Sequence, residues 1–256
     1  MRFGFAASAP FGADVLERLA RNHEIAFVLT QPDAAAGRGR GLRPAPAKLK
    51  AMQLGLPVVE SLDDPLDAET MVLVAYGRLI PSALLERHLW LNIHPSLLPR
   101  WRGAAPVERA IMAGDEETGV TVIKLVEELD AGPIAAQRAF PVDGDAGAVY
   151  DRAAELGTEL LEEVLPNPTF TPQPVDGVTY AEKIGPDDRT LDLSDPKAAV
   201  DRVRALSPHI GARTELHGRP VTVWRARLED GAFVPVEVQP AGGNRMSYEA
   251  FVRGVR

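Results

Sequence analysis

Apolar and polar positions alternate along the first two-thirds of the chain in blocks that predict strands and helices in turn. Short, almost continuous apolar runs predict buried strands at residues 1–6, 24–29, 58–59, 71–75 and 89–93. Apolar residues spaced three or four positions apart predict helices at residues 12–21, 45–54, 81–89 and 104–113. Gly55 and Gly114 follow two of these helices, where a residue with positive φ commonly ends a helix. This alternation predicts an α/β fold with a Rossmann-like, doubly wound, mostly parallel sheet.

The last third of the chain has a different pattern. Strands at 120–126 and 134–140 and a helix over 146–165 complete the first region, and the segment PNPTFTPQPVDG, with four prolines, predicts an exposed linker. A helix at 197–206 and short alternating segments at 219–226 and 233–238 then predict a smaller β-rich domain. We therefore expect a catalytic domain at 1–166, a linker at 167–178 and a second domain at 179–256.

Composition narrows the class of protein. Hydrophobic residues make up 45% and charged residues 25% of the 256 positions, as in ordinary globular proteins. No apolar run approaches the roughly 18 residues of a membrane span, and the apolar start runs directly into a helical pattern, which favours a first strand over a signal peptide. The chain has no cysteine, which excludes disulfides and thiolate chemistry. We expect a cytoplasmic protein with no membrane partner.

Charge is unevenly distributed. The net charge of −8 argues, as an average, against a nucleic-acid partner. From residue 38 to residue 50, however, there are five basic residues and no acidic one. A local basic face on an acidic protein is typical of transient RNA binding.

Candidate chemistry is concentrated in NIHPSLLPRWRGAAPVERAI, residues 92–111, which begins at the end of a predicted strand. Asn92 and His94 are two positions apart and therefore project to the same side of that strand. The apolar run 97–99 follows, and Asp130 lies further along in EELDAGP. Taken singly, these residues are more often structural than catalytic. The five histidines show no metal-ligand spacing, so we predict no metal site.

The combination of Asn92, His94, the following SLLP and Asp130 resembles the 10-formyltetrahydrofolate-dependent formyltransferases, whose acceptors belong to several classes. Four further stretches resemble the methionyl-tRNA branch of this family, so that the similarity runs nearly from end to end. They are QPDAAAGRGRGLRPAPAKLKAMQLGLPV (31–58), RWRGAAPVERAI (100–111), TYAEKIGPDDRTLDL (179–193) and QPAGGNRMSYEAF (239–251).

The resemblance implies an activity. A formyl group would pass from 10-formyltetrahydrofolate, as cosubstrate, to the α-amino group of initiator methionyl-tRNA, without a metal. Asn92 would donate a hydrogen bond to the formyl oxygen, and His94 would do the same when protonated, a state that a nearby carboxylate favours. Asp130 would relay or accept the proton that leaves the amine. The route of that proton is left open, and we expect a monomer.

The resemblance also implies binding residues. Those for folate are Ser96, Leu97, Leu98 and Pro99, together with Arg78, Leu79 and Ile80, which would hold the pterin edge. The alternative for 78–80 is a plain strand-to-helix turn. Those for the tRNA acceptor stem are Arg38 and Arg40, in the loop GRGRG, supported by Arg43 and Lys48. The alternative for this loop is a solvated insertion.

The second domain is short for the family. The resemblance implies a β-barrel of the oligonucleotide-binding type, but the segment between Trp224 and Gln239 is abbreviated, so closure of the barrel is left open. Two other functions also stay open. One is a formyltransferase for a small amine, such as a nucleotide-linked amino sugar or glycinamide ribonucleotide, against which the basic loop and the terminal stretches count. The other is a non-catalytic folate- or RNA-binding protein, against which Asn92, His94 and Asp130 count.

Overall fold

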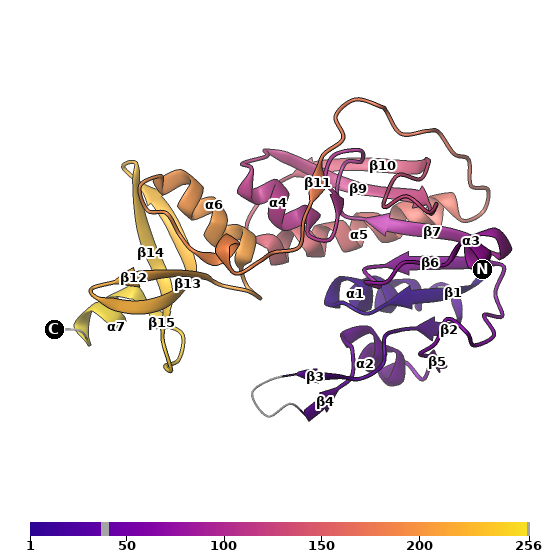
Figure 1. Ribbon diagram of the computed structural model, residues 1–256, viewed down its shortest axis with the longest axis horizontal. Helices are drawn as coiled ribbons and strands as arrows, with labels where there is room; N and C mark the ends of the chain where they lie inside the picture. The colour runs from indigo at the N-terminus through magenta and orange to yellow at the C-terminus, as the bar shows by residue number, and fades with distance from the viewer. Residues whose placement is uncertain (37–40, 255–256) are drawn as a thin grey trace. The chain divides into compact units, whose positions relative to one another are not determined.

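The computed structural model describes residues 1–36 and 41–254 (Figure 1). The chain divides into two compact units whose segments interleave along the sequence. The first unit contains residues 1–102, 119–139 and 151–179, and the second contains 103–118, 140–150 and 180–256. Within the described ranges, no helix is long and apolar enough to cross a membrane.

A seven-stranded sheet forms the core of the first unit, in the order β10-β9-β7-β6-β1-β2-β5. Its strands are β1 (Arg2–Ala7), β2 (Glu24–Leu29), β5 (Val58–Val59), β6 (Thr70–Val74), β7 (Leu89–His94), β9 (Glu117–Lys124) and β10 (Ile134–Pro141). The pairs β2/β5, β1/β2, β1/β6 and β6/β7 are parallel, whereas β7 and β9 are antiparallel. The expected doubly wound, mostly parallel sheet is confirmed.

Helices cover one side of this sheet at close range. Helix α1 (Pro10–Leu19) brings Gly12 so near to β1 that an added Cβ would lie 2.5 Å from the Ala7 methyl group. Helix α5 (Ala146–Val164) does the same with Gly157, whose Cβ would lie 2.6 Å from Ile93. Helix α2 (Pro46–Gln53) packs against α1. Glycine at these contacts lets helix and strand backbones approach closely.

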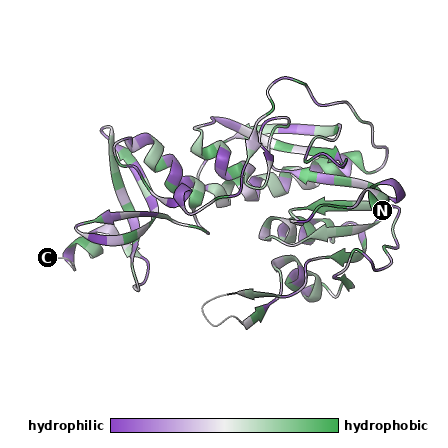
Figure 2. Cartoon of the chain, viewed as in Figure 1, coloured by the Kyte–Doolittle hydropathy of each residue, from purple (hydrophilic) through white to green (hydrophobic). Residues whose placement is uncertain are grey.

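The opposite side of the sheet carries a second apolar cluster. Trp90 and Met71 are fully buried there with Phe27, and Trp90 donates from Nε1 to the Leu84 carbonyl of α3 (Ser82–Arg87) at 2.9 Å. Burial of one such side chain contributes about 2–3 kcal/mol. The strands β1, β2 and β6 are mostly hydrophobic in Figure 2, whereas α6 carries both colours.

Helix boundaries follow proline and glycine. Helices α1, α2, α4 (Pro106–Met112) and α6 (Pro196–Leu206) each have proline in the first turn, where no donor is lost. Gly55 and Gly114 have φ values of 68° and 72°, which confirms the predicted helix ends. The helix expected from residue 104 starts two residues later, because Ala105 has φ −136° and ψ 53°.

The second unit is built on a four-stranded antiparallel sheet in the order β12-β13-β14-β15. Its elements are α4, β12 (Ala212–Leu216), β13 (Arg219–Glu229), β14 (Ala232–Pro240), β15 (Met246–Ser247), the 3-10 turn η1 (Asp187–Arg189), α6 and α7 (Tyr248–Arg253). Val203, Val223, Val238 and Phe251 share its core. The predicted β-rich domain is confirmed. Among the described strands, β12 and β15 are the two ends of this sheet and do not pair with each other, and Arg213 of β12 forms an isolated parallel bridge with Thr190.

Shorter strand pairs complete the fold. β3 (Ala34–Ala36) and β4 (Gly41–Arg43) pair as a small antiparallel hairpin. The alternation pattern did not predict these two strands. β8 (Arg102–Gly103) and β11 (Tyr180–Ala181) pair as a two-stranded sheet.

Candidate active site

The end of β7 presents two buried polar side chains. Residues on this strand alternate between the two sides of the sheet, and Ile93 faces α5. Asn92 and His94 therefore project from the opposite side, and both are only 5% exposed. The parallel neighbours β6 and β7 end at the same edge, where open α/β sheets bind ligands.

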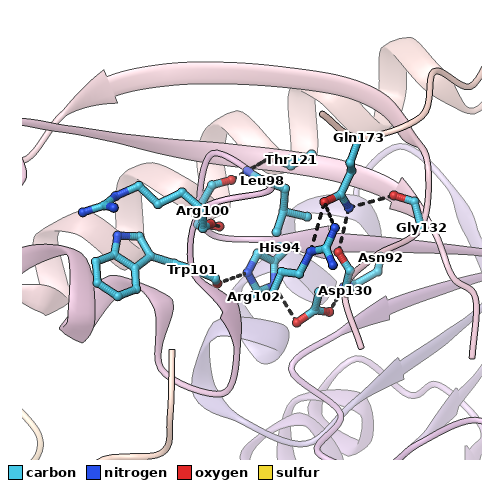
Figure 3. A network of polar contacts seen from close by, with 11 residues as sticks. Asn92, His94, Leu98, Arg100, Trp101, Arg102, Thr121, Asp130, Gly132 and Gln173 are labelled. Carbon is cyan, nitrogen blue, oxygen red and sulfur yellow. Dashed lines mark hydrogen bonds and ion pairs between the residues drawn. The ribbon is translucent and has the colours of Figure 1, made fainter. Parts of the chain in front are cut away.

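Asp130 completes a group of three at this edge (Figure 3). It lies in a turn after β9 with φ 49°, a left-handed conformation that is uncommon for residues other than glycine, asparagine and aspartate. Its Oδ1 accepts from the Asn92 side-chain amide at 3.4 Å, and its Oδ2 lies 3.7 Å from His94 Nδ1. The structure thus brings together the three side chains that the sequence singled out for catalysis.

The other nitrogen of the His94 ring faces the protein backbone. Nε2 lies 2.8 Å from the Trp101 carbonyl oxygen, so this nitrogen carries a proton and donates. With Asp130 on the Nδ1 side, both ring nitrogens face oxygen atoms, and both can donate only in the protonated ring. The contacts of 3.4 Å and 3.7 Å around Asp130 are longer than ordinary hydrogen bonds.

The segment 96–99 follows His94 by two residues and is held by several hydrogen bonds. The Ser96 hydroxyl is buried and donates to the Arg100 carbonyl at 2.7 Å, while the Thr121 hydroxyl donates to the Ser96 carbonyl at 2.6 Å. The Leu98 amide donates in turn to Thr121 Oγ1 at 3.2 Å, ahead of a cis bond to Pro99. Leu97 packs against Gly119, where no Cβ would fit. The partly exposed residues of this segment are therefore Leu97 and Pro99, and the Ser96 hydroxyl is already used within the protein.

The loop after β6 contains the other residues expected to bind folate. Arg78 and Leu79 are exposed, Leu79 by 73%, and Ile80 is half-buried. The start of the loop is fastened by Gln31, whose side-chain amide donates to the Tyr76 carbonyl at 2.8 Å. Because β6 and β7 are parallel neighbours, this loop leaves the same edge of the sheet as Asn92 and His94.

The residues expected to bind tRNA are in different settings. Arg38 and Arg40 lie outside the described residues, and Arg43 is exposed on β4. The side chain of Lys48 is only 17% exposed and pairs with Asp33 and Glu60. Hydrogen bonds to these two carboxylates raise the pKa of Lys48. Lys48 thus fastens the base of the hairpin.

Two residues at this site were missed by sequence reasoning. Arg102 is a charged side chain only 7% exposed, and it donates to the side chain of Gln173. Gln173 lies in the proline-rich segment expected to be an exposed linker, yet Thr171 in that segment exchanges two backbone hydrogen bonds with Ile134 of β10. Arg102 lies in the stretch 100–111 that resembles the methionyl-tRNA branch, but no role was predicted for it, and no local pattern marks Gln173.

The described part of the chain holds no group of three histidine, cysteine or carboxylate side chains that could bind a metal ion. The geometry instead places an amide donor, an imidazole and a carboxylate together at a sheet edge.

Comparison with known proteins connects this geometry to a chemistry. The family model described as formyl transferase matches residues 3–165. The methionyl-tRNA formyltransferase of Ruegeria pomeroyi is 44% identical over 257 residues, which cover 93% of this chain and 85% of that protein. The structure of methionyl-tRNA formyltransferase from Clostridium thermocellum has a similar fold, with a TM-score of 0.69 and 18% identity over 94% of this chain and 98% of that one. HypX from Aquifex aeolicus, solved with tetrahydrofolic acid, matches with a TM-score of 0.67 and 20% identity, over 100% of this chain and 47% of that one.

Proposed function

The chain belongs to the formyl transferase family, and we propose that it transfers the formyl group of 10-formyltetrahydrofolate to the α-amino group of initiator methionyl-tRNA, in the cytoplasm. The observation that carries this proposal is the meeting of Asn92, His94 and Asp130 at the edge of the sheet. The tRNA acceptor is supported by relatives named methionyl-tRNA formyltransferase, which align with most of this chain.

The reaction requires two kinds of charge stabilisation. The amine nitrogen attacks the formyl carbon, negative charge grows on the formyl oxygen, and positive charge grows on the nitrogen. Asn92 and the Nδ1–H of protonated His94, whose Nε2–H is held by the Trp101 carbonyl, donate hydrogen bonds to that oxygen. One preorganised donor contributes typically ~3 kcal/mol. Asp130 accepts the proton lost by the amine. The carbon–nitrogen bond to the folate then breaks, and the same proton passes to the folate nitrogen that leaves.

Folate binding is assigned to two segments, residues 96–99 and residues 78–80. Ser96, Leu97, Leu98 and Pro99 supply a wall near the reacting end, in which Leu97 and Pro99 are partly exposed and Ser96 and Leu98 are buried. Arg78, Leu79 and Ile80 supply the loop against the pterin, which is supported by the shared sheet edge.

Acceptor binding is assigned to the basic segment. Arg38 and Arg40 contact phosphates or base edges of the acceptor stem, and Arg43 and Lys48 support them. The described flanks of the loop are compatible with this role, because the hairpin pairs Ala34 with Arg43 and is fastened by Lys48. We assign catalysis to residues 1–166 of a monomer, with 167–178 as a connection and 179–256 as surface for tRNA.

An acceptor screen tests the proposal. Purified protein and 10-formyltetrahydrofolate are offered initiator methionyl-tRNA, a nucleotide-linked amino sugar and glycinamide ribonucleotide, and product is followed by mass spectrometry. We expect formylation of the tRNA, with kcat/KM at least ~100-fold above that for either small amine. Preferred formylation of a small amine, or folate binding without transfer, would contradict the proposal.

A further inference from the structure

The turn that carries Asp130 is held tightly against the end of β9. Gly132 lies so close to the strand that a Cβ there would stand 1.7 Å from the Lys124 carbonyl oxygen. Lys124 also donates its backbone N–H to the Pro133 carbonyl at 3.0 Å. Because the turn is short and closely packed, the direction of the Asp130 carboxylate depends on where this turn lies.

Gln173 clamps the same turn from the segment that joins the two assigned domains. Its side-chain nitrogen donates to the Asp130 carbonyl at 2.7 Å and to the Gly132 carbonyl at 2.8 Å. Both protons of the amide are therefore used on the backbone that flanks Ala131, and one side chain bridges the turn from end to end (Figure 3).

Arg102 determines which way this amide points. Its Nη2 and Nε donate to Gln173 Oε1 at 2.8 Å and 3.2 Å, and its Nη1 lies 3.3 Å from Glu128 Oε1. A guanidinium has only donors, so it requires the amide oxygen on its side and leaves the nitrogen for the turn. The buried arginine thus engages the turn twice, through Gln173 and through Glu128.

We propose that Gln173, oriented by Arg102, is a positioning residue that holds the Asp130 carboxylate toward Asn92 and His94. This inference rests on the proposed function for its kinetic consequence, but its structural part does not. It makes the proline-rich segment a working part of the active site.

Two variants of one residue separate positioning from anchoring. Gln173→Glu has nearly the same shape and keeps an acceptor for Arg102, but it cannot donate to the two carbonyl oxygens and repels them instead. Gln173→Ala removes both functions. Val175→Ala, at a side chain 93% exposed in the same segment, is the matched control.

In steady-state formylation of methionyl-tRNA, we expect both Gln173 variants to lose ~30-fold in kcat, since a displacement of about 1 Å costs up to a hundredfold. The KM for 10-formyltetrahydrofolate should stay within about twofold of the original. Hydrogen–deuterium exchange in residues 125–134 of the substrate-free protein should accelerate in both variants and not in Val175→Ala.

Wild-type kcat in either Gln173 variant, or unchanged exchange in both, would overturn the inference. If Gln173→Ala failed to fold, Gln173→Glu would carry the test, because Arg102 keeps its partner. If the unaltered protein formylated no tRNA, the proposed function would fail, and the exchange experiment would still decide the positioning claim.

Discussion

Replacing Gly132 with alanine should damage catalysis more than stability. The new methyl group would stand 1.7 Å from the Lys124 carbonyl oxygen, and this separation has to widen to at least 3.0 Å. The obstacle is backbone and cannot rotate away, so the turn itself must retreat. That retreat carries Asp130 with it, because Gln173 binds the carbonyls of both residues. A displacement of about 1 Å in a catalytic group costs ~100-fold in rate. Overpacking of this kind costs roughly 1–3 kcal/mol of stability.

The assay measures kcat for methionyl-tRNA formylation and the free energy of unfolding in urea on the same preparation. Gly254→Ala is the control, because its Cβ would lie 3.6 Å from the nearest atom and its φ of −83° suits alanine. We expect kcat of Gly132→Ala to fall ~100-fold, with a folded protein at low urea. A folded Gly132→Ala variant with kcat within about twofold of the original would refute the claim that this turn sets the carboxylate.

Three further outcomes are expected. Replacing both Arg38 and Arg40 with alanine should raise the KM for tRNA. The slope of log tRNA affinity against log salt concentration should become shallower by up to ~2, while folate binding, measured by titration, stays unchanged. Burial raises the pKa of Glu108, so ionisation opposes folding as pH rises through that pKa. Glu108→Gln should therefore raise the thermal midpoint at about pH 8 and leave it unchanged well below the ordinary pKa of 4.5. A chain ending at Pro172 should be poorly soluble, because it lacks the helix α6 that packs on α4, and its kcat should fall by at least ~30-fold, because it lacks Gln173. A soluble fragment with the original kcat, seen by gel filtration and activity, would contradict this.

The placement of the polar side chains at the end of β7 could be predicted from the sequence, because it depends on the local periodicity of a strand. Asn92 and His94 share a side of β7 simply because they are two residues apart. Asp130 is far along the chain, and only the family resemblance connected it to them. The turn that brings it back combines a left-handed residue with a glycine pressed against a carbonyl, and no alternation of apolar residues encodes that arrangement.

The proline-rich segment shows why other parts of the site could not be predicted. Four prolines and polar neighbours are typical of an exposed linker, and the structure does leave Val175 exposed. Gln173 nevertheless reaches a buried arginine and two carbonyls, through contacts that depend on tertiary structure.

In the second unit, a sequence signal for a hairpin was present but was overlooked. Asp230 and Gly231, with φ of 50° and 76°, join β13 to β14, and Asp-Gly is a strong hairpin signal.

The central claim is that Asn92, His94 and Asp130 together perform formyl transfer to methionyl-tRNA. The most direct test is the single-turnover rate of this transfer, at saturating 10-formyltetrahydrofolate, for Asn92→Ala, His94→Ala and Asp130→Ala beside the original protein. Each variant should be folded and at least ~100-fold slower, because each lacks a group that acts on charge in the transition state. A rate close to that of the original protein in any one of them would contradict the claim and remove that residue from the mechanism.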